Sequence, residues 1–395
     1  MIGLRTIFAN TFLMRKEEFN MRREVLILVT IASLIGLTGY AQAQVYKIGA
    51  VYPFTGPLAV YAEDAKRGIE IAVDEVNSMG GIKGKKLEVI YENDGGTPSG
   101  SVTAVQKLIT VDKVPAIVGT LFTSFTMAAG PVAERNKTVI MVPMASSSKF
   151  SEWEYIFRVT PSTDFQARVI AEYAYRVLGL KKIASLFYTM DTGYAWDTNL
   201  TERFQQLGGT VVIHETYPSG STDFRTALTK IKAMNPEVIS VYGTWKEIAT
   251  QVKQMKELRI ETKVLNCSQV EEPAFIQTLG KDANGVTYAI QAPPSTEASQ
   301  KALQEFLAKY RSKYNRDPGI VVKTSYDCVK IFAQAAMRVG DTREDLQKAI
   351  AKTKDYPGVD GELSYDEKRN PIKKITVKVI EDEKFVQTGF ESTGQ

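Results

Sequence analysis

The side chains that could do chemistry gather in five short segments, each after a run that reads as a β-strand. These segments are rich in hydroxyls, aromatic rings and glycine, and they cover residues 52–61, 119–126, 143–148, 189–196 and 243–246. In an open α/β sheet, ligands bind beyond the carboxyl ends of the strands. The five segments therefore favour a site that binds a small molecule in a cleft.

The sequence offers little for catalysis. His214 is the single histidine, so no Ser-His-Asp, Cys-His or two-histidine metal set can be assembled. The glycine groups match neither a phosphate loop nor a dinucleotide fingerprint. We expect no enzyme, no cofactor and no metal; a carboxylate-only hydrolase and a sensory ligand-binding domain are the alternatives. Cys267 and Cys328 stand outside metal-ligand spacings, and they form either one disulfide or two separate buried thiols.

The elements that must position these segments alternate between strands and helices. Strands are expected at 45–51, 87–91, 115–118 and 138–142, with helices at 62–79, 100–111 and 124–135 between them. The pattern restarts after Arg158, with a helix at 164–178, strands at 182–188, 238–242 and 263–265, and a helix over 224–231 capped by Thr222 or Asp223. Helices at 298–314 and 324–339 and a hairpin at 375–388 complete the chain. This alternation predicts an α/β architecture of mostly parallel sheets.

The first residues have the three parts of a secretory leader. Arg22 and Arg23 precede an uncharged, mostly apolar run at 25–37, and small residues at 41–43 suit signal peptidase. The run is too short for a membrane-spanning helix, which needs roughly 20 apolar residues. We therefore expect cleavage before Gln44 and export by the general secretory route. The residue directly after the expected cleavage site is Gln44 and not a cysteine, so a lipid anchor is not expected.

Charge and length bound the remaining chain. The full sequence carries a net charge of +4, and removal of residues 1–43 leaves 352 residues with a net charge of +2. A nearly neutral chain argues against a nucleic-acid partner. A length of this kind exceeds a typical single domain and predicts two lobes.

Six segments, in their order and spacing, resemble one family. They are TGPLAVY at 55–61, GGIKGKKLEVIYEND at 80–94, IVGTLFTSFT at 117–126, IFRVTPSTDFQ at 156–166, STDFRTALTKIK at 221–232 and GVDGELSYDEKRNPIK at 358–373. The chain is similar to type I periplasmic solute-binding proteins of branched-chain amino-acid ABC transporters. The resemblance implies two Rossmann-like lobes joined by three crossovers. It also implies a monomeric periplasmic receptor that delivers a small carboxylate ligand to the permease subunits of an ABC transporter.

The resemblance also implies how the chain divides. The N-terminal lobe is expected to combine residues 44–163 and 292–365. The C-terminal lobe is expected to combine residues 164–291 and 366–395, with residues 1–43 removed as the leader and upstream segment. The three crossovers are placed near 162–165, near 289–293 and within 361–375.

By the same resemblance, two strand-to-helix turns hold the carboxylate of the ligand. Thr123 occupies the first position, and Ser146 occupies the second beside the backbone of Met144 and Ala145. A helix N-terminus with convergent N–H groups binds anions well. The alternative is that the two hydroxyls only cap helices, although capping and anion binding can coexist.

The family lines its cleft with aromatic residues. Tyr61, Tyr194 and Trp245 stand at the matching positions of this chain, each in a turn segment. The alternative for a single aromatic residue is core packing, which we expect of Phe187 and Tyr188.

One departure from the family bears on the ligand. Amino-acid binders pair the ligand ammonium with two acids, where this chain has Thr163 and Ser268. Glu271, Glu272 or Asp164 could compensate, since an unpaired buried ammonium is costly. We therefore expect an amino acid or related small carboxylate, with a non-amino aromatic or aliphatic acid as the alternative. Lys323 is either a partner for a second carboxylate or a solvated surface residue.

Overall fold

The computed structural model describes residues 45–340 and 342–393. The leader, the apolar run at 25–37 and the expected mature terminus at Gln44 lie outside the described residues. Within those described ranges, no helix combines the length and the apolar character that spanning a bilayer requires.

The first sheet has five strands in the order β2-β1-β3-β4-β5. They are β1 (Val45–Tyr52), β2 (Lys86–Asn93), β3 (Ala116–Gly119), β4 (Val139–Val142) and β5 (Ile156–Arg158). The pairs β1–β3, β3–β4 and β4–β5 are parallel. The carboxyl ends of neighbouring parallel strands lie at the same edge of a sheet. The segments that follow β3 and β4 therefore lie side by side at that edge.

The second sheet has seven strands in the order β14-β13-β10-β9-β8-β6-β7. They are β6 (Lys182–Tyr188), β7 (Thr210–Tyr217), β8 (Val238–Tyr242), β9 (Lys263–Cys267), β10 (Val286–Gln291), β13 (Lys374–Glu381) and β14 (Lys384–Thr393). The strands from β7 to β10 pair in parallel, and β13 and β14 add antiparallel at the edge. The expected C-terminal hairpin is thus part of this sheet.

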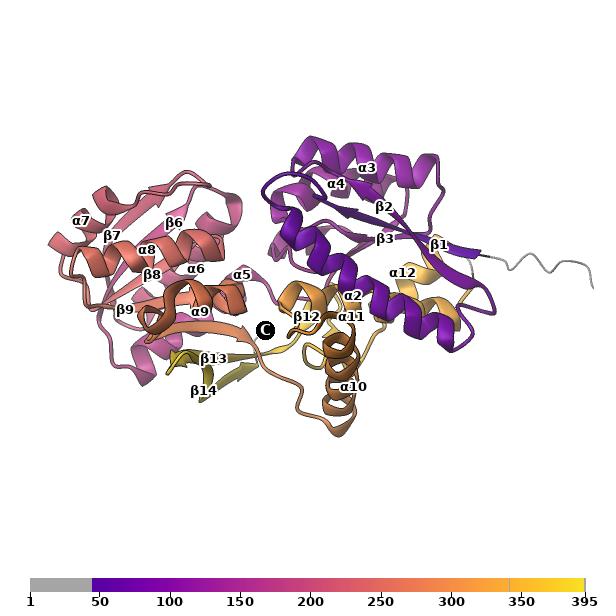
Figure 1. Cartoon of the computed structure of the whole chain (residues 1–395). Coiled ribbons are helices and arrows are strands. Elements are labelled where there is room, and N and C mark those ends of the chain that lie inside the picture. Colours follow the sequence, from indigo (N-terminus) through magenta and orange to yellow (C-terminus); the bar gives the residue numbers. More distant parts are fainter. Residues whose placement is uncertain (1–44, 341, 394–395) are drawn as a thin grey trace, which may run out of the picture. The chain divides into compact units, whose positions relative to one another are not determined.

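Helices cover both faces of the sheets (Figure 1). They are α2 (Ala59–Ser78), α3 (Pro98–Thr110), α4 (Thr123–Arg135), α5 (Thr163–Glu172), α6 (Asp191–Gln206), α7 (Arg225–Ala233), α8 (Trp245–Glu257), α9 (Pro273–Leu279), α10 (Glu297–Tyr314), α11 (Ile320–Arg338) and α12 (Arg343–Ala351). Short helical turns are η1 (Ser148–Glu152), η2 (Tyr173–Val177), η3 (Ser268–Val270) and η4 (Gly280–Ala283), and β11 (Ser364–Tyr365) pairs with β12 (Pro371–Ile372).

Alternate residues of the central strands enter different cores. Val118 and Met141 point into the large core cluster, whereas Ile117 and Ile140 point into the cluster under α3 and α4. Successive side chains of a strand face opposite sides of a sheet, and both sides are covered here. This explains why these strands are continuous apolar runs in the sequence.

The chain crosses between the two sheets more than once. It leaves the first sheet after β5, returns after β10 and enters the second sheet again at β13. Between the last two crossings, α11 packs on α2, as Figure 1 shows. We use first lobe and second lobe for the two sheets with the helices that pack on them. The α/β fold with mostly parallel sheets is confirmed, while the residue boundaries of the lobes stay a prediction.

Some local expectations were wrong. Phe224, not Thr222 or Asp223, is the N-cap residue of α7, although Asp223 Oδ1 accepts a hydrogen bond from the N–H of Arg225 at the start of this helix. The expected helix at 164–178 changes to a π-helical turn at Tyr173. Helices α6 and α12 and strand β10 had not been predicted, since their apolar residues are interrupted by polar ones or lack clear flanking signals.

Candidate functional site

A cavity of about 390 Å³ lies between the carboxyl ends of strands from both lobes. The first lobe lines it with Leu58, Gly96, Pro98, Leu121, Phe122, Thr123, Ser124, Phe125, Met144, Ala145 and Ser146. The second lobe lines it with Tyr188, Met190, Asp191, Thr192, Ser219, Tyr242, Thr244 and Gln269. Aromatic and aliphatic groups dominate these walls, with hydroxyls placed among them, as is usual for small-molecule sites.

The first-lobe wall brings together the two turns expected to hold a carboxylate. Thr123 is the first residue of α4, and Ser146 follows β4. The Ser146 N–H lies 3.4 Å from Thr123 Oγ1, which is long for an N–H···O bond. The first N–H groups of a helix have no acceptor within the helix, and they carry its positive macrodipole end. This end of the cavity can therefore accept an anion.

A chain of hydroxyls leads from this wall to the second lobe. Ser146 Oγ and Thr163 Oγ1 are 2.6 Å apart, and Thr163 Oγ1 is 3.5 Å from the hydroxyl of Tyr242. Close by, the Tyr188 hydroxyl lies 2.6 Å from Thr192 Oγ1. Burial raises the pKa of both tyrosines, so they stay neutral. The chain offers neutral donors and acceptors, and no charge, to a ligand.

The three expected cleft aromatics lie outside the cavity lining. Tyr61 is buried on α2, where its ring contacts Phe122, a lining residue, at 6.0 Å between centroids. Trp245 begins α8 and gives Tyr61 a side-chain hydrogen bond that partly offsets the rise in the pKa of Tyr61 caused by burial. Tyr194 is 51% exposed and packs on Phe187. Tyr61 and Trp245 thus form a second layer between the lobes, and Tyr194 is at the surface.

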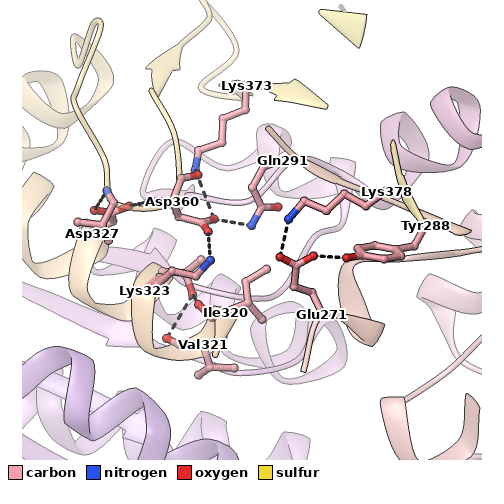
Figure 2. Close-up of polar contacts among 12 residues, drawn as sticks. Glu271, Tyr288, Gln291, Ile320, Val321, Lys323, Asp327, Asp360, Lys373 and Lys378 are labelled. Atoms are coloured by element: carbon pink, nitrogen blue, oxygen red, sulfur yellow. Dashed lines mark hydrogen bonds and ion pairs between the residues drawn. The ribbon is translucent and has the colours of Figure 1, made fainter. Parts of the chain in front are cut away.

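Ser268 and Glu271 also lie beside the cavity rather than on its wall. Ser268 opens the short helix η3, and its neighbour Gln269 lines the cavity instead. Glu271 is held by the second lobe: it accepts a hydrogen bond from the Tyr288 hydroxyl and pairs with Lys378 at 2.6 Å (Figure 2). The carboxylate of Glu271 therefore already has a cation.

Lys323 is neither solvated nor free. Its Nζ lies 3.1 Å from Asp360 Oδ1, and Asp360 also accepts hydrogen bonds from Gln291 and, through its carbonyl, from Lys373 (Figure 2). Asp327 accepts the backbone N–H of Asp360 at 3.2 Å. These five residues, which we call the crossover cluster, tie α11 to the segments where the chain passes between the lobes.

Sequence reasoning found only part of the wall that the second lobe contributes: Met190, Asp191, Thr192 and Thr244 lie in the expected segments 189–196 and 243–246. Tyr188 had been expected in the core, but it lines the cavity, and Tyr242 does so too. Each is the last residue of its strand, β6 or β8, and that position could have identified both. Asp191 is the first residue of α6, a helix that the sequence did not predict. Among the described lining residues, Asp191 carries the one carboxylate.

The remaining candidate groups lie away from the cavity lining. Cys267 and Cys328 are separate buried thiols, and burial raises the pKa of Cys267 to about 12. His214 pairs with Asp197, with Nδ1 2.9 Å from Oδ2, on the outer strand β7. Within the part of the chain that the structure describes, no group of three or more metal-binding side chains is found.

The family model for periplasmic binding proteins matches residues 45–382. The chain belongs to the periplasmic binding protein family. Within it, the relatives are type I proteins of the branched-chain amino-acid transporter branch. The Leu/Ile/Val-binding protein homolog 1 of Brucella abortus (strain 2308) is 26% identical over 355 residues, which is 89% of this chain and 94% of the relative.

Two solved structures place this periplasmic binding protein among its neighbours. The substrate-binding protein LivJ of Streptococcus pneumoniae, solved in complex with isoleucine, has a TM-score of 0.80 and 27% identity over 89% of this chain and 99% of its own. A solute-binding protein of Rhodopseudomonas palustris BisB5, solved with 3,4-dihydroxy benzoic acid, has a TM-score of 0.80 and 25% identity over 88% and 97%. The fold is thus shared with proteins whose ligands are both carboxylic acids.

Proposed function

We propose that this periplasmic binding protein captures a small carboxylate between its lobes and delivers it to the permease subunits of an ABC importer. One observation carries the proposal: an apolar cavity ends at Thr123, Ser146 and the N-terminus of α4. The apolar walls suit the body of the ligand, and the hydroxyl and N–H end suits its carboxylate. The family membership supports the receptor role and a periplasmic location.

The cavity favours a carboxylate without an α-ammonium group. Thr163 and Ser268 are neutral where amino-acid binders have acids, and Glu271 is paired with Lys378. A ligand ammonium group would lose its hydration on entry, and hydrogen bonds to the hydroxyl chain could offset only part of this desolvation free energy. The aromatic acid bound by the Rhodopseudomonas palustris protein supports this ligand class.

An α-amino acid is the second candidate, because Asp191 lies on the cavity wall. Asp191 is exposed in the present conformation and could turn toward a ligand ammonium. The isoleucine bound by LivJ supports this candidate. The two ligand classes differ only in the α-ammonium group, so pairs of ligands matched in every other group distinguish them.

A thermal-shift screen of the mature protein tests the proposal. Leucine and phenylalanine are compared with 4-methylpentanoate, 3-phenylpropanoate and 4-hydroxybenzoate. A ligand at about 100 times its Kd stabilises the folded state by roughly 2.7 kcal/mol, which raises the melting temperature by several degrees. We expect the acids without an ammonium group to give this shift. If none of the carboxylates shifts the melting temperature, the proposed function is wrong.

The same samples test the choice between a binding protein and an enzyme. His214, the single histidine, pairs with Asp197 and does not line the cavity, so it is not placed for proton transfer there. Incubation of each binding ligand with the protein, followed by proton NMR, should return the ligand unchanged. Conversion of the ligand would contradict the binding role.

A further inference from the structure

Glu272 makes a contact between the two lobes at a place outside the cavity lining. It is the N-cap residue of α9, which packs on α8 of the second lobe. Its carboxylate lies against Gly319, the residue before α11 of the first lobe. A Cβ atom added to Gly319 would be 2.9 Å from Oε2 and 3.0 Å from Oε1 of Glu272. The contact exists because position 319 has no side chain.

The cations near Glu272 are already committed to other acids. Lys323, on the first turn of α11, pairs with Asp360 in the crossover cluster (Figure 2). Arg316, just before α11, pairs with Asp64 of α2. Among the described residues, the side chain of Glu272 has neither a hydrogen bond nor an ion pair of its own.

Other groups around Glu272 are acidic or neutral. Asp64 faces it from α2, and Glu271 precedes it in the chain with its own charge taken by Lys378. The Tyr61 hydroxyl is a neutral neighbour on α2. A negative charge on Glu272 is therefore brought into a partly buried contact without a counter-ion of its own.

The net effect of these surroundings is to favour the neutral form of Glu272. Burial, with the negative charge of Asp64, raises the pKa of Glu272 to about 7, and Lys323 and Arg316 oppose the rise only in part. The positive macrodipole end of α11 also favours the ionised form, but it does not replace the lost water. When the lobes separate, the side chain regains water and its ordinary pKa.

We propose that Glu272 is a positioning residue that makes lobe closure, and with it ligand affinity, depend on pH. A neutral Glu272 fits against Gly319, and an ionised Glu272 opposes the contact. The inference rests on the proposed function, since it concerns the closure that captures the ligand. It adds a response to pH at a place that lies outside the cavity lining.

The sign of the effect follows from linkage. A pKa that is higher in the closed contact means that the closed form binds the proton more tightly than the open form. Closure is therefore favoured at pH values below the closed-form pKa and is weakened as the pH rises through it. With about 7 in the closed contact and about 4.5 in the open form, affinity should fall about tenfold between pH 6 and pH 8.

The test is calorimetric titration at pH 6, 7 and 8 with whichever of leucine, phenylalanine, 4-methylpentanoate, 3-phenylpropanoate and 4-hydroxybenzoate binds. The unaltered protein should bind the ligand about tenfold more weakly at pH 8 than at pH 6. Glu272→Gln keeps the shape of a neutral acid, so it should lack the tenfold fall in affinity that Glu272 causes. Asp327, whose pKa burial raises to about 6, titrates in both proteins, so the difference between them reports Glu272 alone.

Two further variants locate the effect. Gly319→Ala fills the space that the carboxylate occupies, and its extended backbone accepts alanine, so the pH dependence should disappear there too. Glu261→Gln, at an exposed acid of the second lobe, should keep the pH dependence of the unaltered protein. The same pH profile in all four proteins would overturn the inference.

A ligand-free measurement separates this inference from the proposed function. If none of the five carboxylates binds at any pH, the proposed function fails and closure is followed directly. Small-angle X-ray scattering should then show a smaller radius of gyration at pH 6 than at pH 8, and no such change in Glu272→Gln. Equal radii at both pH values in the unaltered protein would overturn the inference in that case.

Discussion

At the scale of single residues, the proposed carboxylate end of the cavity is prepared but not saturated. Ser146 Oγ is bonded to Thr163 at 2.6 Å, while the Ser146 N–H reaches Thr123 only at 3.4 Å. A carboxylate can take over this weak N–H contact and accept hydrogen bonds from the Thr123 and Ser146 hydroxyls, because Ser146 Oγ can still accept a hydrogen bond from Thr163. Thr123 is buried and Ser146 half-buried, so bonds formed there compete little with water.

Thr123→Ala and Ser146→Ala should each weaken ligand binding. A hydrogen bond to a charged group contributes about 1.5–3 kcal/mol, so the expected loss of affinity is roughly 10- to 100-fold per variant. Calorimetry with the best ligand of the thermal-shift screen measures it.

Thr103→Ala, at an exposed hydroxyl of α3, is the matched control and should bind normally. All three variants should melt within a few degrees of the unaltered protein, which shows that the fold survives. Unchanged affinity in both cavity variants would mean that these hydroxyls only shape the turns.

At the scale of elements, the crossover cluster depends on how closely α11 lies on α2. Gly68 in the middle of α2 makes this possible, because a Cβ there would be 2.1 Å from the carbonyl oxygen of Val322. The close approach places Lys323 and Asp327 of α11 in the crossover cluster. It also places Gly319 against Glu272.

Gly68→Ala should destabilise the protein although alanine is the better helix former. Forcing a methyl group into a filled contact costs typically about 1–3 kcal/mol, and part of this is offset by the roughly 1 kcal/mol gain in helix propensity. Urea unfolding should therefore show a lower midpoint. Glu63→Ala, at an exposed position of α2, should not lower it. A higher midpoint for Gly68→Ala would show that α11 can move away without loss.

The sequence predicts individual helices and strands better than the contacts between residues of different elements. Strands such as β4 and β8 are buried on both faces and are almost wholly apolar, so a run like Val238–Tyr242 can be recognised without a structure. The hydroxyl pair of Ser146 and Thr163 joins residues of two lobes, and no local pattern specifies such a pair. For the same reason, the ion pairs that occupy Lys323 and Glu271 could not be foreseen.

At the scale of the whole molecule, two lobes share one cavity and the chain passes between them at three places. Gln291 and Lys373 lie at or near two of these crossings, and both donate hydrogen bonds to Asp360, so the crossover cluster links the two crossing segments. Rotation of one lobe against the other, the hinge closure of a receptor that encloses its ligand, stays our proposal for how this protein captures its ligand.

The central claim is that this cavity binds a small molecule by its carboxylate. Calorimetric titration of the unaltered protein with the best acid of the screen and with the carboxamide of the same acid tests it most directly. The two ligands have nearly the same size, and only the acid carries the charge that the α4 N-terminus and the hydroxyls favour. We predict that the acid binds and that the amide binds at least about 100-fold more weakly. Equal binding of the acid and its amide would contradict the account.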